Sequence, residues 1–486
     1  MKILIANRGE IAIRILRALK ELGIKSAVIF SEADRLSPHV LLSEEAYFIG
    51  PSPAHLSYLK KEEIIKLAKE VKADAIHPGY GFLAENFEFA KMCRENGIIF
   101  IGPNPESMKL LGSKILSRRQ AIKNNIPIIP GSIEPIKDLR EGKKIIEEIG
   151  LPVLLKASAG GGGKGMRLVE KMTDFPSLFE NAQREAIGYF ADPSIYIEKV
   201  IKNPKHIEVQ ILCDHFGKRI YFPERECSLQ RRHQKIFEET PSVVVDKEKR
   251  KEIGEIALKV AQMAGYDSVG TVEFLRDENG NFYFLEMNTR IQVEHPITEE
   301  ITGIDLVKEQ ILIALGEKLS IKQDEIVLNG HSMECRIYAE DPLRNFAPSP
   351  GRILFLENPS GFGIRVDSGI RENFSIPLDY DPLLSKLITW GKKREQAIER
   401  AKRALDEYKI EGIATTIPFF KEILKIREFI DGSYNTSTID KFLKKYQHKT
   451  EREDFPFLIA LSSFLYLKER EEKIFPEQKL SQWRWK

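Results

Sequence analysis

Two glutamates in residues 270–288 are the side chains in this sequence best placed for chemistry. Apolar and aromatic residues fill two arms around Asn279 and Gly280, a pair typical of a type I′ β-hairpin turn. If these two residues form the loop, counting outward places Glu273 opposite Glu286. Like charges that face each other across a sheet are destabilising, so this pairing predicts a cation between the two carboxylates.

The cation expected at this hairpin is magnesium or manganese. Asn288 lies two residues beyond Glu286, projects from the same strand face and adds a third oxygen ligand. Oxygen donors without Cys or His favour these ions over zinc. From the hairpin alone two alternatives stay open. The acids could point at water, or a three- or five-residue loop could shift the register by one and separate Glu273 from Glu286.

A run of glycines follows a predicted strand in residues 153–166, VLLKASAGGGGKGM. Backbone N–H groups in such a loop can approach phosphate oxygens closely, and Lys156 and Lys164 flank it. It is not a Walker A loop, because Gly165 follows Lys164 where Ser or Thr is required. We interpret the run as a mobile flap over a nucleotide, with a flexible hairpin tip as the structural alternative.

Basic residues concentrate in the segment 226–235, which contains Arg231, Arg232, His233 and Lys235. A run of this kind is often only a solvated face. Because no aromatic residues are interleaved with the charges, nucleic-acid binding is disfavoured. Binding of a small anion fits better.

Residues 288–296 follow the hairpin and place Arg290, Gln292 and Glu294 at every second position. In an extended segment these side chains share one face, beside the predicted metal. An arginine can bind a planar oxyanion through two parallel hydrogen bonds, and Glu294 could remove a proton from that anion. A surface ion pair is the alternative.

Composition indicates a globular protein of two to four domains. The chain has 486 residues, of which 42% are hydrophobic, and its 74 basic and 72 acidic side chains nearly cancel. No whole-molecule field therefore favours nucleic acid or an anionic membrane. Four scattered cysteines fit neither a disulfide framework nor a zinc site. We expect a cytoplasmic protein, with no targeting segment before the strand at residues 2–6 and no membrane span.

Strands and amphipathic helices alternate in the first hundred residues. This order predicts an α/β domain with a parallel sheet covered by helices on both faces. The strands are expected at 2–6, 26–30, 73–77 and 98–101, and the helices at 11–22, 61–72 and 84–95. Farther along, a helical link at 103–125 precedes the proline-rich residues 126–132, and a helix is expected at 394–408.

Six motifs in this order closely resemble the biotin carboxylases of the ATP-grasp superfamily, over residues 2 to about 446. They are IANRGEIA at 5–12, HPGYGFLAEN at 77–86, KASAGGGGKGM at 156–166, ERECSLQRRHQK at 224–235, EMNTRIQVEHP at 286–296 and GHSMECRIYAEDP at 330–342. The resemblance implies an α/β and α+β fold: an N-terminal Rossmann-like domain, an ATP-grasp fold with a mobile glycine-rich lid, and a biotin carboxylase C-terminal domain. The implied boundaries are 1–112, 113–201 for the linker helix and lid, 202–330 for the central subdomain, 331–446, and a C-terminal extension at 447–486.

The resemblance also implies a reaction in two halves. Bicarbonate attacks the γ-phosphate of ATP to give carboxyphosphate, which breaks down to carbon dioxide and phosphate. The phosphate then takes the N1′ proton of biotin, and the biotin enolate captures the carbon dioxide. The implied cofactors are ATP, Mg²⁺ or Mn²⁺, and biotin on a partner protein. Phosphoryl transfer asks a protein mainly for positioning and charge neutralisation.

Residue roles carry over from the resemblance by position. Expected ATP contacts are Lys114, Lys156, Gly162, Gly163, Met166, Glu198, Lys199, Ile201, His206, Gln230 and His233. Expected metal ligands are Glu273, Glu286 and Asn288. Expected bicarbonate and biotin contacts are Tyr80, Lys235, Arg290, Gln292, Val293 and Arg336. Glu294 matches the general base, Arg336 matches the residue that stabilises the biotin enolate, and Lys235 and Arg290 complete the expected catalytic set.

No biotin attachment site is expected on this chain. Residues 108–110, Met-Lys-Leu, look similar to one but fall in a predicted helix. We therefore expect a separate biotin carrier protein, a separate carboxyltransferase subunit and a homodimer of this chain. The acyl acceptor stays open among acetyl-CoA, pyruvate and 2-oxoglutarate. The alternatives are another ATP-grasp carboxylate–amine ligase and a non-catalytic nucleotide-binding regulatory subunit.

Overall fold

The computed structural model describes residues 1–157, 166–190 and 192–450. The chain divides into two units, residues 1–438 and 439–486, and each is described by itself. Within the described residues, the second unit contains most of helix α15 (Thr438–Thr450). The functional residues expected from the sequence all belong to the first unit.

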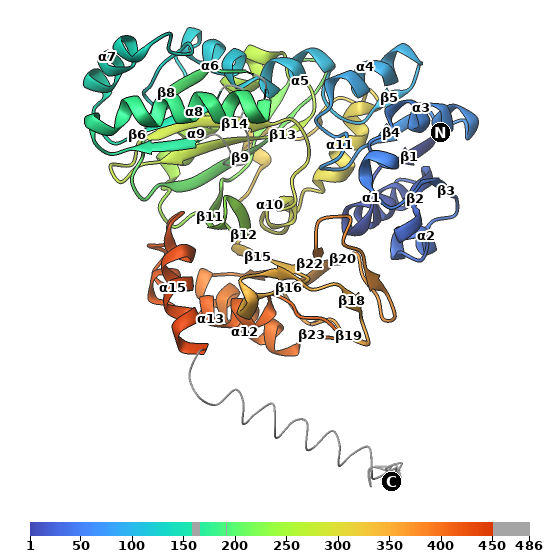
Figure 1. Cartoon of the computed structure of the whole chain (residues 1–486). Coiled ribbons are helices and arrows are strands. Elements are labelled where there is room, and N and C mark those ends of the chain that lie inside the picture. Colours follow the sequence, from blue (N-terminus) through green and yellow to red (C-terminus); the bar gives the residue numbers. More distant parts are fainter. Residues whose placement is uncertain (158–165, 191, 451–486) are drawn as a thin grey trace, which may run out of the picture. The chain divides into compact units, whose positions relative to one another are not determined.

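A five-stranded parallel sheet with the order β3-β2-β1-β4-β5 forms the N-terminal part of the first unit (Figure 1). Its strands are β1 (Lys2–Ile5), β2 (Lys25–Ser31), β3 (Ala46–Gly50), β4 (Ala75–His77) and β5 (Ile99–Phe100), and its helices are α1 (Gly9–Glu21), α2 (Pro38–Leu42), α3 (Lys61–Glu70) and α4 (Phe87–Glu95). Ile3 and Ile5 pack with α1, whereas Leu4 packs with Ile64 of α3 and Phe89 of α4. The predicted parallel sheet with helices on both faces is confirmed. Strand β3 and helix α2 were not predicted.

The predicted helical link at 103–125 is two helices, α5 (Pro105–Gly112) and α6 (Lys114–Lys123). They separate at Ser113, whose extended backbone ends α5 and whose side chain caps α6 by accepting a hydrogen bond from the Leu116 N–H. Met108 is buried within α5, so the Met-Lys-Leu sequence lies in a helix as predicted.

A small antiparallel sheet with the order β7-β6-β8 follows. Its elements are α7 (Leu139–Ile149), β6 (Val153–Ala157), β7 (Met166–Val169), α8 (Phe175–Phe190) and β8 (Ile195–Lys199). Leu155 and Ile197 pack against Phe175 and Phe179 of α8. The glycine run between β6 and β7 falls within residues 158–165, which lie outside the described residues, and Gly162 and Gly163 with it.

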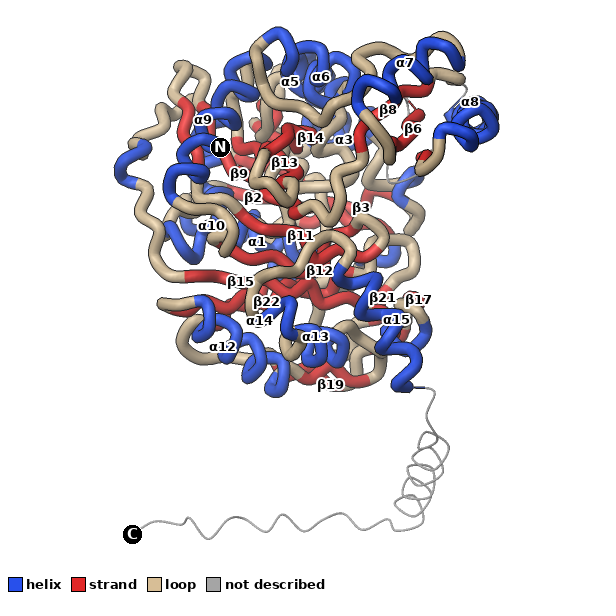
Figure 2. Tube along the Cα trace, turned by 90° about the vertical axis from the view of Figure 1, so that its left-hand side faces the viewer, coloured by secondary structure: helices blue, strands red, loops and turns tan. Residues whose placement is uncertain are grey.

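The largest sheet contains nine strands, eight of them in the order β14-β13-β9-β11-β12-β15-β22-β20, with β10 paired to β9 (Figures 1 and 2). Its strands are β9 (Lys205–Cys213), β10 (Arg219–Tyr221), β11 (Arg225–Arg231), β12 (Gln234–Thr240), β13 (Val269–Arg276), β14 (Phe282–Asn288), β15 (His331–Tyr338), β20 (Ile364–Ser368) and β22 (Leu383–Gly391). Helices near it are α9 (Lys247–Ala264), α10 (His295–Thr302), α11 (Leu306–Ala314), α12 (Arg394–Glu407), α13 (Ile417–Ile423) and α14 (Arg427–Ile430). Helix α12 confirms the expected helix at 394–408.

Short strand pairs join β16 (Glu340–Asp341) to β17 (Ala347–Pro348), β18 (Gly351–Arg352) to β21 (Ser375–Ile376), and β19 (Phe355–Glu357) to β23 (Lys409–Glu411). The expected domain boundaries stay predictions.

The side chains of strand β9 alternate between an apolar face and a polar face of this sheet. Ile207, Val209 and Ile211 pack with Ile253 and Val260 of α9. Because side chains alternate along a strand, the even-numbered residues of β9 project from the opposite face. That polar face carries the candidate functional site.

The hairpin of β13 and β14 has the predicted carboxylate pair but a different turn. Asp277 pairs with Asn281 through its N–H, and only Gly280 of the loop is in the left-handed region, with φ 87°. The predicted type I′ turn is therefore wrong, since the loop is one residue longer. That loop alone would pair Glu273 with Leu285, but a register shift between Glu273 and Phe274 leaves Leu285 as an extra residue. Glu273 consequently faces Glu286, as predicted.

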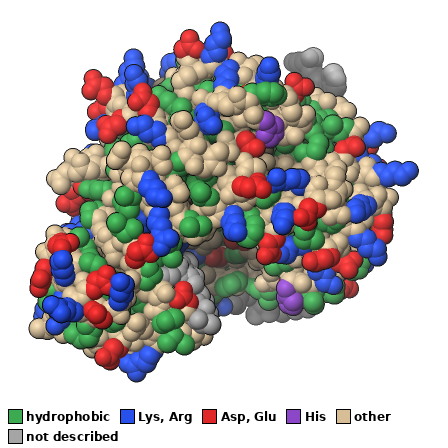
Figure 3. All heavy atoms as spheres, turned by 90° about the horizontal axis from the view of Figure 1, so that it is seen from above, with side chains coloured by type: hydrophobic (Ala, Val, Ile, Leu, Met, Phe, Trp, Pro, Cys, Tyr) green, Lys and Arg blue, Asp and Glu red, His purple; other side chains and the backbone are tan. Residues whose placement is uncertain are grey.

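None of the helices in residues 1–157, 166–190 and 192–450 combines the length and apolar character needed to cross a bilayer. All four cysteines of the chain are buried and free. On the face of the first unit shown in Figure 3, Lys and Arg side chains are interspersed with Asp and Glu side chains. This mixture agrees with the near balance of charge in the sequence.

Replacement of Gly280 by alanine should destabilise the hairpin, because φ at this position is 87°, in the left-handed region. An added Cβ would meet no atom closer than 3.4 Å, so no steric clash contributes to the effect. Backbone strain alone should cost about 1 kcal/mol, which thermal unfolding detects as a lower midpoint. Gly188→Ala in α8 is the matched control, since an added Cβ meets nothing within 4 Å and φ is not in the left-handed region. The control should leave the midpoint unchanged or raise it. Equal midpoints for Gly280→Ala and the parent would contradict the turn assignment.

Candidate functional site

A row of charged residues crosses four neighbouring strands on the polar face of the large sheet. Glu286 of β14 faces Glu273 of β13, Glu273 faces Glu208 of β9, and Glu208 faces Arg225 of β11. Three carboxylates in adjacent positions repel each other, and burial makes this repulsion stronger. The row is stable only if cations lie close to it.

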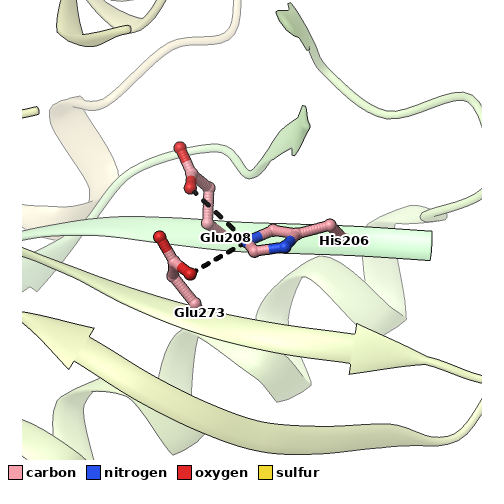
Figure 4. Close-up of side chains that lie close together, drawn as sticks. All are labelled: His206, Glu208 and Glu273. Carbon is pink, nitrogen blue, oxygen red and sulfur yellow. Dashed lines mark ion pairs between the residues drawn. The ribbon is translucent and has the colours of Figure 1, made fainter. Parts of the chain in front are cut away.

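Lys235 of β12 provides the largest compensation. Its ammonium group donates hydrogen bonds to Glu208 (2.5 Å), Glu273 (2.7 Å) and Glu294 (2.8 Å). Burial on its own would lower the pKa of Lys235, but the three carboxylates outweigh it and hold the pKa well above its usual value. Figure 4 shows His206 beside the same row, with Nε2 3.0 Å from an oxygen of Glu273. Lys235 is therefore charged and fixed among three acids.

Glu273 and Glu286 differ in their electrostatic environment. Burial would raise the pKa of Glu273, but Lys235 and His206 hold it well below the usual value. Burial raises the pKa of Glu286, and the charge of Glu273 raises it further, although Lys114 and Lys235 act in the opposite direction. The Glu286 carboxylate is thus the member of the row whose charge the protein compensates least.

A divalent cation would fit between Glu273 and Glu286, because the charge of Glu286 is the less compensated of the two. Glu273, Glu286 and Asn288 offer oxygen ligands, and a cation there would neutralise the repulsion between the two glutamates. Asn288 now donates through Nδ2 to Glu273 (2.7 Å), so its amide must rotate to present an oxygen. Among the described residues, His206, Glu208 and Glu273 also place one donor atom each within 4.8 Å of the others. Lys235 already neutralises that second group, so we assign it no metal.

The segment after the hairpin, which bends at residues 289 and 290 and turns at 293 and 294, brings three predicted residues to the same site. Arg290 donates to Glu85 (3.0 Å) and to the Asn288 oxygen (3.0 Å). Gln292 is buried and donates through Nε2 to Glu273 (3.0 Å). Arg290, Gln292 and Glu294 therefore lie beside the carboxylate row, but the extended conformation predicted for this segment is wrong.

Glu294 is held between two cations. One oxygen accepts from Lys235 (2.8 Å) and the other from Arg336 of β15 (2.9 Å). Burial would raise the pKa of Glu294, but Lys235 and Arg336 outweigh it and hold the pKa well below the usual value. Arg336 also donates to Glu238 (2.6 Å), whose pKa burial raises to about 7 despite this contact. In this arrangement Glu294 is a poor proton acceptor until an anion draws the cations away.

A cavity of about 380 Å³ lies next to this group of charges. Lys114, Lys156, Met166 and Glu198, all expected to contact ATP, line it together with Glu286 and Asn288. Lys156 pairs with Glu198, which also accepts from Arg118 (3.3 Å). The cavity thus combines apolar walls with lysines, as a nucleotide with its phosphates requires. Its full lining is Glu85, Leu111, Gly112, Lys114, Ser117, Arg118, Ile128, Lys156, Ala157, Met166, Tyr196, Glu198, Phe284, Leu285, Glu286, Met287, Asn288 and Thr289.

The other expected ATP contacts that the structure describes lie outside the cavity lining. His206 and Gln230 are hydrogen-bonded to each other (3.1 Å) beside the carboxylate row. The Lys199 ammonium donates to the carbonyls of Gly150 and Leu151 (both 3.0 Å), so its side chain is occupied there. Ile201 and His233 do not line the cavity either. Arg232 and His233 form the exposed two-residue tip between β11 and β12, with φ of 53° and 65°.

Tyr80 and Val293, expected to contact bicarbonate or biotin, are linked through buried residues of two other elements. The Tyr80 hydroxyl donates to Glu10 of α1, and Glu10 pairs with Lys386 of β22 (3.1 Å). Lys386 also donates to the Val293 carbonyl (3.0 Å). This chain of contacts holds the backbone next to Glu294.

Sequence reasoning missed several residues of the site. Glu208 could have been found, because His206, Glu208 and Gln210 alternate with apolar residues in a strand. Arg225 and Glu85 lie within two of the quoted motifs and Arg118 lies in none, but the roles of all three depend on contacts with other segments that the sequence does not show.

Three protein-family models match successive parts of the chain. The family model described as "Biotin carboxylase, N-terminal domain" matches residues 1–108, "Carbamoyl-phosphate synthase L chain, ATP binding domain" matches 113–322, and "Biotin carboxylase C-terminal domain" matches 334–441. A pyruvate carboxylase subunit of Methanothermobacter thermautotrophicus is 50% identical over 91% of this chain and 90% of its own length. Biotin carboxylase 1 of Bacillus subtilis is 48% identical over 92% of this chain and 98% of its own length.

A solved structure is similar over the same region. The biotin carboxylase domain dimer of Hydrogenobacter thermophilus 2-oxoglutarate carboxylase, in complex with MgADP, ADP and bicarbonate, is 49% identical. It aligns with a TM-score of 0.86 over 90% of this chain and 97% of that one. Together with the family models and the identity to full-length relatives, this likeness shows that the chain belongs to the biotin carboxylase family.

Proposed function

We propose that this chain catalyses the ATP-dependent carboxylation of biotin held on a separate carrier protein, with bicarbonate as the carbon source. A bicarbonate oxygen attacks the γ-phosphorus of ATP, and the bond to the ADP oxygen breaks. The carboxyphosphate formed releases carbon dioxide and phosphate. The phosphate accepts the N1′ proton of biotin, and N1′ then bonds to the carbon dioxide. Family membership and relatives solved with nucleotide and bicarbonate support this proposal.

One observation carries the proposal: the oxyanion-binding side chains and the nucleotide-sized cavity meet at Asn288. Asn288 lines the cavity and accepts a hydrogen bond from Arg290. An anion beside Arg290, Gln292 and Lys235 would therefore lie next to the phosphate end of a nucleotide in the cavity. This closeness is what direct attack on a γ-phosphate requires.

The residues of the site divide into three groups in this proposal. Lys235, Arg290, Gln292 and the backbone at Val293 bind bicarbonate, and Glu294 removes its proton. An incoming anion competes with Glu294 for Lys235 and Arg336, and this competition raises the low pKa of Glu294 toward the range useful for a base. Arg336 and Tyr80 face biotin, where Arg336 stabilises the enolate.

The nucleotide contacts form the second group, and the metal ligands form the third. We propose that Lys114, Lys156, Gly162, Gly163, Met166, Glu198, Lys199, Ile201, His206, Gln230 and His233 contact ATP. Glu273, Glu286 and Asn288 would hold Mg²⁺ or Mn²⁺, which neutralises charge on the phosphates when bound. Because the repulsion between Glu273 and Glu286 disappears when a cation lies between them, metal and nucleotide should bind cooperatively.

The proposed partners are a biotin carrier protein, a carboxyltransferase subunit and a second copy of this chain. Related proteins named as subunits of pyruvate and 2-oxoglutarate carboxylases, and the dimer of the solved relative, support this assembly. Four free, buried cysteines are consistent with work in the cytoplasm. We also propose the domain boundaries 112/113, 201/202, 330/331 and 446/447.

The direct test is ADP release by the purified chain with and without bicarbonate and free biotin. The proposal expects ADP release that requires bicarbonate and increases with biotin. ATP binding without bicarbonate-dependent release would instead indicate a regulatory subunit, and release dependent on an amine would indicate a carboxylate–amine ligase. Co-purification of a biotinylated protein with its carboxyltransferase would then identify the acyl acceptor.

Glu286→Gln should raise the Mg²⁺ concentration needed for ATP cleavage by more than about tenfold, since loss of even an outer-shell partner typically costs ~10–100-fold in affinity. Folding should be unaffected, because the change removes a charge that Glu273 repels. A Mg²⁺ titration of ADP release measures the shift. Glu278→Gln, at an exposed position of the same hairpin, is the control and should match the parent. Superimposable titration curves for Glu286→Gln and the parent would remove Glu286 from the metal site.

Arg336→Lys should reduce biotin carboxylation at least about tenfold more than it reduces bicarbonate-dependent ATP cleavage, because a charge-assisted bidentate contact is worth ~1.5–3 kcal/mol. Lysine keeps a positive charge beside Glu238 and Glu294 and so limits structural damage. The measurement compares carboxybiotin formation with ADP release in the same samples. Arg394→Lys, at another carboxylate-paired arginine, is the control and should change neither. Equal loss of both activities in Arg336→Lys would rule out a role specific to the enolate.

A further inference from the structure

Arg225 is the most completely hydrogen-bonded side chain next to the site, and none of the roles proposed above accounts for it, although it lies within the 224–235 motif. It stands at the start of β11, at the end of the carboxylate row, and its side chain is fully buried. Its guanidinium donates to five side chains from two strands, helix α10 and the segment after β14. The acceptors are Glu208 (2.6 Å), Gln210 (3.0 Å), Thr271 (3.2 Å), Gln292 (2.6 Å) and Thr298 (3.0 Å).

The contact with Gln292 sets the direction of its amide group. The Gln292 oxygen accepts from Arg225, so its nitrogen faces the other way, toward Glu273 (3.0 Å). An amide donor that points to the carboxylate side is also available to an oxyanion that arrives there. With the amide reversed, the oxygen of Gln292 would face both Glu273 and the incoming anion, and the arrangement would be repulsive.

The contact with Glu208 has a second consequence. Glu208 accepts from Arg225 through Oε1 and from Lys235 through Oε2. Because Arg225 already satisfies one oxygen of Glu208, Lys235 is left to share its charge with Glu273, Glu294 and any incoming anion. The charge of Arg225 also contributes to the low pKa of Glu294. Arg225 thus influences Gln292, Lys235 and Glu294, three residues proposed to bind or deprotonate bicarbonate. Its own side chain is fully buried and does not reach the solvent-accessible part of the site.

We infer that Arg225 is a positioning residue that fixes the Gln292 amide and the Lys235 ammonium in the orientation that receives bicarbonate. The inference rests on the proposed function, since it presupposes that Gln292 and Lys235 bind this anion. A lysine could supply the charge of Arg225 but not the planar fork that reaches Glu208, Gln292 and Thr298 together. The role therefore belongs to the shape of the guanidinium as well as to its charge.

The test measures bicarbonate-dependent ADP release by the full chain carrying Arg225→Lys. The expected result is an increase of about tenfold or more in KM for bicarbonate, from loss of charge-assisted hydrogen bonds. ATP affinity, measured by direct binding, should change less than about twofold, because the cavity lining does not include Arg225. Arg250→Lys is the matched control, since Arg250 donates two hydrogen bonds to Glu224, the buried residue that directly precedes Arg225. It should leave KM for bicarbonate unchanged.

A double-mutant comparison separates positioning from a general structural role. If Arg225 acts through Gln292, Arg225→Lys should add little to the KM increase already caused by Gln292→Ala. Fully additive effects, an unchanged KM in folded Arg225→Lys, or equal loss of ATP affinity would each overturn the inference. If Arg225→Lys does not fold, Thr298→Val removes one acceptor of the guanidinium and should raise KM for bicarbonate by about twofold to fivefold. An unchanged KM in that variant would also overturn it.

The parent protein distinguishes failure of this inference from failure of the proposed function. A parent with bicarbonate-dependent ADP release and an Arg225→Lys variant with the same KM would reject the inference alone. A parent without such release would reject the proposed function, and the role of Arg225 with it.

Discussion

Repulsion among three carboxylates in adjacent strands, two of them buried and one half-buried, is the constraint on which this structure depends. Glu286, Glu273 and Glu208 face one another in register, and the protein places Lys235, His206 and Arg225 against the row. This compensation is uneven, because the pKa of Glu273 is held low while that of Glu286 is raised by burial and by its neighbour. The remaining electrostatic cost lies at the edge of the nucleotide-sized cavity, where a metal ion and phosphates can relieve it.

The same charges explain how a strongly paired glutamate can serve as a base. With Lys235 and Arg336 on its two oxygens, Glu294 is ionised but barely basic. An oxyanion that enters must take hydrogen bonds from those cations, and each bond it takes weakens their hold on Glu294. Basicity therefore appears together with the substrate. Without the oxyanion, the ionised Glu294 stays paired with Lys235 and Arg336, so the protein contains no unpaired charge at this buried position.

The sequence predicted the carboxylate pair for reasons that were only partly right. The loop is one residue longer than assumed, and the extra residue Leu285 restores the register between Glu273 and Glu286. Strongly periodic elements, such as α1 and α12, agree with prediction within two residues at each end. Edge strand β3 was missed because its half-buried residues show no clear alternation. The role of Arg225 was missed because it depends on contacts with residues up to 73 positions away in the sequence.

Lysine and arginine divide the compensation of the row according to their geometry. Lys235 is a point charge shared among three carboxylates, so it can also donate to an incoming anion without leaving any one acid fully unpaired. Arg225 is fully buried and held by five acceptors, so any reorientation would break several hydrogen bonds together. A cation held by five acceptors on one side of the row and a cation shared among three acids on the other keep the carboxylates in place while the charge balance at the site changes. A second lysine in place of Arg225 would supply the charge without this rigidity, since its ammonium has three donors and no fixed plane.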